Sequence, residues 1–204
     1  MNVPPIFDEI AGRDTVEFTV PLVSGRKVRT EAVVDPMTLG TETVSLLATG
    51  DHAIFPLLTT RGMIHWQLAM PARADIATLC ERWAQAAGLG EYGFGRLVHI
   101  LRNLDLVEAD LQRFYNVDLS TWPRGEITTR RVVVLISGLW HERSSLFWSE
   151  MEDHDPLTKE ATILAQLASS PGEPHPFLVS RQLRRQRAED DAKAERMRTR
   201  GLSG

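Results

Sequence analysis

Apolar and polar residues alternate near the start of the chain. Between Val16 and Val20 every second residue is apolar, which is the spacing of a strand with one buried face. A second apolar run follows Gly25, a residue that adopts the backbone angles of a tight turn without a steric penalty. We therefore predict a β-hairpin in which Thr15–Val23 pairs with Lys27–Val34.

From residue 35 onward the apolar positions recur at intervals of three and four residues, which is typical of helices that bury one face. Glycine and proline interrupt this pattern and divide it into segments. The predicted helices span 35–48, 54–70, 71–87, 94–115 with a break near 103–105, 129–139, 146–151 and 155–168. In the last of these, Leu157, Ala161, Leu164 and Leu167 share one apolar face.

Residues that commonly end or begin helices support several of these boundaries. Asn116 suits the left-handed conformation that closes a helix, and Thr128 and Ser144 or Ser145 can cap the next two. The run Val132–Ile136 also fits a buried strand. We favour a helix because of the cap at Thr128.

The predicted fold is mainly α with a small N-terminal β-hairpin (α+β), a helical bundle-like body and a charged C-terminal tail. We divide the chain into an arm (1–14), a hairpin with helices (15–90), a helical domain (91–168), and a linker with a tail (169–204). Residues 181–200 hold eight basic and four acidic side chains, so they carry a charge of +4 and the remainder carries −8. Such a tail is expected to be solvated, as an exposed helix or partly disordered.

Composition narrows the class of protein. The 204 residues are 43% hydrophobic and 25% charged, which is ordinary for a soluble globular protein. A single cysteine, Cys80, excludes an internal disulfide. Neither a signal-peptide pattern nor an apolar run of membrane-spanning length is present in the sequence. We expect a cytoplasmic protein with no membrane contact.

None of the reactive side chains forms a convincing catalytic or metal-binding pattern. The four potential ligands in Glu152–Asp155 are adjacent, so their side chains diverge. Cys80 lies on an apolar helix face, where cysteine is usually a core residue. The Gly-x-Gly in Tyr92–Arg96 lacks the third glycine of a nucleotide-binding loop. We predict a non-enzymatic protein without catalytic, metal-binding or cofactor-binding residues and without a cofactor.

Large aromatic residues gather where two predicted helices meet. Trp140, Phe147 and Trp148 are either core residues or anchors for a partner, since exposed aromatic side chains often anchor interfaces. We therefore treat all three as candidate partner-binding residues.

The stretch from Asp110 to Ser145 contains Arg113-Phe114-Tyr115, then Asp118-Leu119, then Gly125, and then Arg130-Arg131 ahead of an apolar run. This stretch resembles a motif of the tail assembly chaperones of long-tailed phages that infect actinobacteria. In that motif an acidic-apolar helix ends in Arg-aromatic-Tyr-x-x-Asp-Leu, and a glycine-containing turn leads to a helix that opens with two arginines. The residues that carry the resemblance, which we interpret as structural, are Arg113, Tyr115, Asp118, Gly125, Arg130 and Arg131. The likeness extends over about Leu106–Ser169. It departs at Trp140-His141, where the family often has prolines, and at Phe114, where it often has tyrosine.

The resemblance implies a function in tail assembly. Such a chaperone coats the tape measure protein, a very long helical chain that sets tail length, before tail tube subunits polymerise around it. We therefore expect the tape measure protein as partner, with self-association and tail tube subunits as further contacts. Location in the host cytoplasm and absence from the mature virion are also implied. The family is commonly made in two lengths by ribosomal frameshifting, and Ser169–Pro176 is where an extension could begin.

Two other classes of protein remain as alternatives. One is a phage structural protein, such as a head–tail connector or a minor virion protein. The other is a nucleic-acid-binding regulator that uses the basic tail, which is disfavoured because four acids interrupt the tail and no aromatic residues accompany its basic ones.

Overall fold

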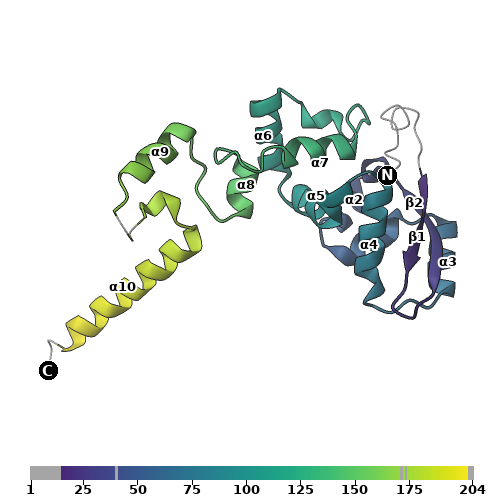
Figure 1. Ribbon diagram of the computed structural model, residues 1–204, viewed down its shortest axis with the longest axis horizontal. Helices are drawn as coiled ribbons and strands as arrows, with labels where there is room; N and C mark the ends of the chain where they lie inside the picture. Colours follow the sequence, from purple (N-terminus) through teal and green to yellow (C-terminus); the bar gives the residue numbers. More distant parts are fainter. Residues whose placement is uncertain (1–14, 40, 171, 173, 202–204) are drawn as a thin grey trace. The chain divides into compact units, whose positions relative to one another are not determined.

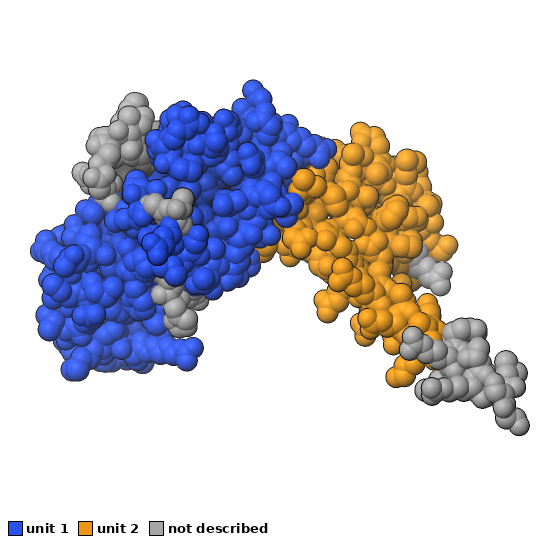
Figure 2. Space-filling model, turned by 180° about the vertical axis from the view of Figure 1, so that it is seen from behind, with its two compact units in different colours: residues 1–138 blue, residues 139–204 orange. Residues whose placement is uncertain are grey.

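The computed structural model describes residues 15–39, 41–170, 172 and 174–201. These residues are mainly helical and include a two-stranded antiparallel sheet, as predicted. The predicted arm at 1–14 lies outside the described residues. The chain divides into two compact units, residues 1–138 and 139–204, which are coloured separately in Figure 2. This division falls inside the segment 91–168 that the sequence suggested as one domain.

The predicted hairpin forms, with strands that end slightly earlier than predicted. Strand β1 (Thr15–Pro21) pairs with β2 (Lys27–Val33), from Thr15 opposite Val33 to Pro21 opposite Lys27. Gly25 occupies the turn with φ of 80°, in the left-handed region that favours glycine. The buried positions of β2 alternate along the strand and include Val28, Thr30 and Ala32.

Two of the predicted helices are divided in the structure. The segment 35–48 forms a 3-10 turn, η1 (Pro36–Leu39), and helix α2 (Thr41–Leu47), and the segment 54–70 forms η2 (Asp51–Leu57) and α3 (Thr60–Leu68). The second division has a local cause. The Thr59 hydroxyl accepts a hydrogen bond from the Gly62 N–H at 3.1 Å, so α3 begins only there.

Helices α3 and α4 (Asp75–Ala86) pack along the hairpin, α3 beside β2 and α4 beside β1 (Figure 1). In the predicted apolar stripe of α4, Leu79, Cys80 and Trp83 are buried. Trp83 is fully buried, and its indole N–H donates a hydrogen bond to the carbonyl oxygen of Val33 at 2.8 Å. This bond ties α4 to the end of β2.

The middle of the chain follows the predicted helix boundaries. After η3 (Gly90–Tyr92), α5 (Gly93–Arg102) and α6 (Leu104–Tyr115) are separated at Asn103, inside the predicted break. Asn116 ends α6 in the left-handed conformation, with φ of 52°. The run Val132–Ile136, for which a strand was the alternative, belongs to a helix, α7 (Thr129–Ser137). The Thr128 hydroxyl caps this helix by accepting a hydrogen bond from the N–H of Arg131.

A hydrogen-bond network joins α7 to the start of the helical region. One carboxylate oxygen of Asp35 accepts from the backbone of Thr129 at 2.9 Å, and the other accepts from the Thr129 hydroxyl at 2.6 Å. The same hydroxyl accepts a bond from the buried indole of Trp122, which lies beyond η4 (Leu119–Thr121), at 3.0 Å. The two bonds of Asp35 connect residues 94 positions apart.

The second unit contains three helices and a short turn in its described part. Ser145 caps α8 (Leu146–Met151), as predicted. Helix α9 (Lys159–Leu167) is capped by Thr158, so the predicted start at Asp155 is wrong. Asp155 instead bonds to arginines of α10 (Arg181–Gly201), which follows η5 (Pro176–Leu178). The tail that we predicted to be solvated forms this helix, α10, and the side chains of its residues 185–193 are exposed.

Candidate functional site

Two residues of the motif, Tyr115 and Arg130, join elements of the first unit. The Tyr115 hydroxyl donates a hydrogen bond to the carbonyl oxygen of Leu135 at 3.1 Å and so joins the end of α6 to α7. Gly138 leaves room for this contact, because a Cβ at that position would lie 3.0 Å from the Tyr115 oxygen. The motif tyrosine thus acts as a clamp between two helices.

The paired arginines have different surroundings. Arg130 is half-buried, and its Nε donates a hydrogen bond to the carbonyl oxygen of Gly88, just beyond the end of α4, at 3.2 Å. Arg131 is exposed. Gly125 adopts φ of 74° in the turn before α7, and this positive angle favours glycine there.

Arg113 lies in the last turn of α6, and Asp118 lies in the connection after it. Asp118 caps η4 by accepting the N–H of Ser120 at 2.8 Å. The hydroxyl and N–H of Ser120, with Arg124 nearby, lower the pKa of Asp118. The guanidinium of Arg113 lies over the Phe114 ring, 5.0 Å from its centre. These contacts are those expected of structural residues.

Removal of the Tyr115 hydroxyl tests the clamp. We expect Tyr115→Phe to lower the free energy of unfolding by about 1 kcal/mol, because the carbonyl of Leu135 loses a donor while the ring remains. Urea unfolding of both proteins would measure the difference. Tyr92→Phe is the matched control, since it retains the ring that lies 5.3 Å from the guanidinium carbon of Arg96. An equal effect of both substitutions would contradict the clamp.

The three candidate partner-binding aromatics differ in exposure. Phe147 and Trp148 are buried at 1% and 5% exposed, whereas Trp140 is 46% exposed. The ring of Trp148 contacts both others edge to face, with its centre 4.5 Å from that of Trp140 and 5.2 Å from that of Phe147. Burial makes Phe147 and Trp148 core residues, so only Trp140 stays a candidate for contact with a partner.

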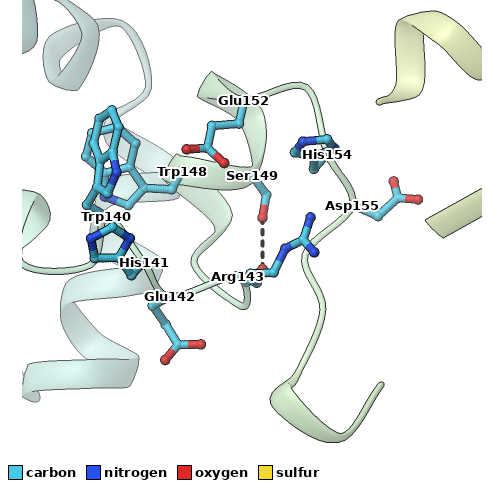
Figure 3. A pocket seen from close by; sticks show the side chains of 9 residues that line it. All are labelled: Trp140, His141, Glu142, Arg143, Trp148, Ser149, Glu152, His154 and Asp155. Carbon is cyan, nitrogen blue, oxygen red and sulfur yellow. Dashed lines mark hydrogen bonds between the residues drawn. The ribbon is translucent and has the colours of Figure 1, made fainter. Parts of the chain in front are cut away.

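A surface pocket of about 170 Å³ lies beside Trp140 and Trp148 (Figure 3). Its walls come from the loop before α8, from α8 itself and from the loop after it. The lining residues are Trp140, His141, Glu142, Arg143, Trp148, Ser149, Glu152, His154 and Asp155.

The polar groups of this pocket are largely engaged in holding its loops. The Ser149 hydroxyl donates to the carbonyl oxygen of Arg143 at 3.2 Å, and Glu142 accepts from the Ser144 hydroxyl at 2.7 Å. The Nδ1 atom of His154 is buried and has no hydrogen-bond partner among the described residues. The Ser149 hydroxyl therefore bonds to the backbone of the loop before α8.

The first turn of α10 is fixed by ion pairs to α8 and to the loop after it. Arg181 pairs with Glu150 at 2.8 Å and with Asp155 at 3.6 Å, and it also donates to the carbonyl oxygen of His154 at 3.0 Å. Arg184 pairs with Asp155 at 2.6 Å. Asp155 thus binds two guanidinium groups, and we call this cluster of Glu150, Asp155, Arg181 and Arg184 the α10 anchor.

Loss of Asp155 should loosen the first turn of α10, because Arg184 loses its ion-pair partner and Arg181 loses one of two. We expect Asp155→Ala to make tryptic cleavage after Arg181 and Arg184 several-fold faster, since the anchoring carboxylate is gone while global stability changes little for a half-exposed pair. Limited proteolysis with mass spectrometry would measure this. Glu152→Ala is the control, because it removes a carboxylate of the pocket and not of the anchor. Equal cleavage rates for the two variants would contradict the assignment.

Helix α9 places its large side chains in solvent. Ile163, Leu164 and Leu167 are 55%, 66% and 78% exposed, whereas Ala165 is buried. The predicted apolar face therefore exists, but at Leu164 and Leu167 it is turned outward. The spacing of the apolar residues identified the helix face, while its direction depends on tertiary packing that spacing does not encode.

The described residues hold no group of three or more His, Cys, Asp or Glu side chains that could bind a metal ion. In the same part of the chain, no helix is both long enough and apolar enough to span a membrane. No protein-family model, curated protein or solved structure matches the chain. Its function is therefore inferred from its own residues and their contacts.

Proposed function

We propose that the chain is a tail assembly chaperone of a long-tailed actinobacterial phage, which binds the tape measure protein and keeps it soluble while the tail is built. In this proposal the protein performs no catalysis and acts in the host cytoplasm. It leaves the assembly before the virion is complete, as tail tube subunits replace it.

The observation that carries the proposal is the structural use of the motif. The residues that resemble the chaperone family join α4, α6 and α7 through the bonds of Tyr115 and Arg130 and through the turns at Asn116 and Gly125. They support a helical framework, in line with our interpretation of these residues as structural. The exposed aliphatic residues of α9 add a surface of the kind that a binding protein requires.

The segment Ser169–Pro176 is where we place the start of a frameshifted extension. Helix α9 ends at Leu167, and η5 begins at Pro176, so the segment lies between two elements. An extension that begins here would leave α8 and α9 unchanged. It would replace the charged helix α10 with a different C-terminal segment.

Co-expression with the phage's tape measure protein tests the proposal. We expect the tape measure protein to be recovered in the soluble fraction with this chain and to precipitate without it. A long helical protein from an unrelated source is the control for nonspecific solubilisation. Precipitation of the tape measure protein both with and without this chain would refute the proposal.

The location of the protein separates this function from the main alternative. A head–tail connector or minor virion protein remains in purified particles, whereas a chaperone is absent from them. Mass spectrometry of purified virions and of infected cell lysates would therefore distinguish the two. Detection of the chain in virions at a stoichiometric level would favour the connector.

A further inference from the structure

Arg143 differs from the other half-buried arginines of the chain. Burial takes a guanidinium partly out of water, so its N–H groups need acceptors from the protein or from a ligand. Five arginines are half-buried in the part of the chain whose burial the structure describes. Four of them donate hydrogen bonds to oxygen atoms of the protein, namely Arg96, Arg130, Arg181 and Arg184. The guanidinium of Arg143 has no acceptor among the described residues, and it lines the pocket beside Trp140 and Trp148.

The backbone of Arg143 is fixed, whereas its guanidinium is open to a ligand. Its carbonyl oxygen accepts hydrogen bonds from the Ser149 hydroxyl at 3.2 Å and from the Leu157 N–H at 2.9 Å. Figure 3 shows the side chain extending from this backbone toward the loop that carries His154. The unpaired Nδ1 atom of His154 is enclosed, so the donors that a ligand reaches from the pocket are those of Arg143. A fixed backbone also reduces the entropy that is lost on binding.

The carboxylates of the pocket determine how much negative charge an occupant carries. Asp155 is held by the two arginines of the α10 anchor, and Glu142 accepts two hydrogen bonds from Ser144. Glu152 is exposed, so water and salt screen its charge. A single negative charge is therefore tolerated beside Arg143, whereas the three nearby acids disfavour a doubly charged group such as phosphate.

An aromatic wall stands beside this guanidinium. Trp140 is 46% exposed, and its ring packs edge to face against Trp148, so the pocket presents indole surface next to Arg143. A cavity of about 150 Å³ accepts one benzene ring, and this pocket has a volume of about 170 Å³. It therefore has room for one small apolar group that carries a carboxylate.

We propose that this pocket binds a carboxylate attached to a small apolar group, with the carboxylate on the guanidinium of Arg143 and the apolar group against the indole of Trp140. A guanidinium donates two parallel hydrogen bonds to a carboxylate, and this geometry selects a planar anion. Free aromatic or aliphatic acids contain this combination, and so does the carboxyl end of a polypeptide. The proposal concerns residues 140–155 alone and is independent of the function proposed above.

Titration of the full chain with phenylacetate tests the site, because this ligand joins one ring to one carboxylate. A ligand of about ten non-hydrogen atoms in an open pocket should bind with a Kd in the millimolar range. We expect the indole N–H resonances of Trp140 and Trp148 to shift in NMR spectra, while those of the other three tryptophans stay in place. Phenylacetamide, which keeps the ring without the charge, and inorganic phosphate, which lacks the ring, should each bind at least tenfold more weakly.

Substitution of Arg143 identifies the group that recognises the anion. Arg143→Met removes the guanidinium and keeps an unbranched side chain, so the saturable shifts should be lost in the same concentration range. Arg143→Lys keeps the charge without the planar fork and should bind with intermediate affinity. The matched control is Arg73→Met, because Arg73 is exposed and lies outside the pocket, and this variant should bind as the wild type does. Circular dichroism would verify that all variants are folded.

Three results would overturn the proposal. They are an absence of indole shifts at about 20 mM phenylacetate, equal binding by the Arg143→Met protein, and equal binding of phenylacetamide. A short peptide that ends in phenylalanine distinguishes the two sources of the carboxylate once binding is established. Affinity at least tenfold higher for the peptide than for phenylacetate would identify a carboxyl terminus as the ligand, and equal or lower affinity would identify a free acid.

Discussion

Replacement of Gly62 by alanine is expected to lower the free energy of unfolding by about 3 kcal/mol, because the new methyl group would overlap a strand. A Cβ at Gly62 would lie 2.1 Å from the carbonyl oxygen of Glu31 and 2.9 Å from both the Glu31 nitrogen and the Thr30 hydroxyl oxygen. Two of these three atoms belong to the backbone of β2, so no side-chain rotation relieves the overlap. Helix α3 or the hairpin would have to move.

The hydrogen bonds around Gly62 add to the cost of that movement. Thr59 donates its N–H to the carbonyl of Glu31 at 3.0 Å, and the buried hydroxyl of Thr30 donates to the carbonyl of Gly62 at 3.1 Å. A displacement of α3 would lengthen both bonds and leave buried polar groups without partners.

Gly95→Ala provides the matched comparison for Gly62→Ala. Gly95 also lies within a helix, α5, but a Cβ there would have no atom within 4 Å. Alanine is the better helix former, so we expect Gly95→Ala to be neutral or to stabilise by up to about 1 kcal/mol. Urea unfolding of the three proteins would measure both effects. A Gly62→Ala protein as stable as the Gly95→Ala protein would show that α3 does not approach β2 this closely.

Truncation of Trp83 is the second substitution for which we expect a large effect. Trp83→Ala should destabilise the first unit by about 4 kcal/mol, because it empties a fully buried site of a very large side chain. The indole fills the space between the hairpin and α5. It packs edge to face against Phe94, with ring centres 5.7 Å apart, while its N–H reaches Val33.

A second variant separates the two roles of this indole. Trp83→Phe keeps most of the apolar volume but removes the donor to the carbonyl of Val33, so it should cost about 1–2 kcal/mol. Leu68→Ala, at a position 72% exposed in the same unit, should change stability by less than about 0.5 kcal/mol. Thermal unfolding would rank the variants. A Trp83→Ala protein that unfolds together with Leu68→Ala would contradict the central position of this side chain.

The elements that the sequence predicted well are those with local signals. The hairpin depends on alternation and on Gly25, and the boundary between α6 and α7 depends on Asn116 and Thr128, which act on their own neighbours. The strand alternative for Val132–Ile136 is excluded in favour of the helix that the cap suggested. Periodicity alone did not decide between these alternatives, because a fully buried segment is apolar in either form.

The features that the sequence did not predict depend on contacts between distant residues. Gly62 lies within the predicted helix 54–70, and periodicity gave no sign that its lack of a side chain allows α3 to approach β2. Asp155 was assigned to a helix start, whereas it binds arginines almost thirty positions later. Of the candidate site residues, the motif residues occupy structural positions, and Trp140 alone among the aromatic candidates remains substantially exposed. Hydrophobicity cannot separate a core tryptophan from a surface one.

The contact between Trp140 and Trp148 gives the second unit an optical signature. Two indole rings with centres 4.5 Å apart and planes inclined at 66° are close enough for their electronic transitions to couple, and the coupling has a preferred handedness. Coupled transitions of this kind produce a pair of oppositely signed bands in the circular dichroism spectrum. The other three tryptophans, Trp66, Trp83 and Trp122, belong to the first unit. The paired bands would therefore follow the packing of residues 139–204, while the helical signal reports on the whole chain.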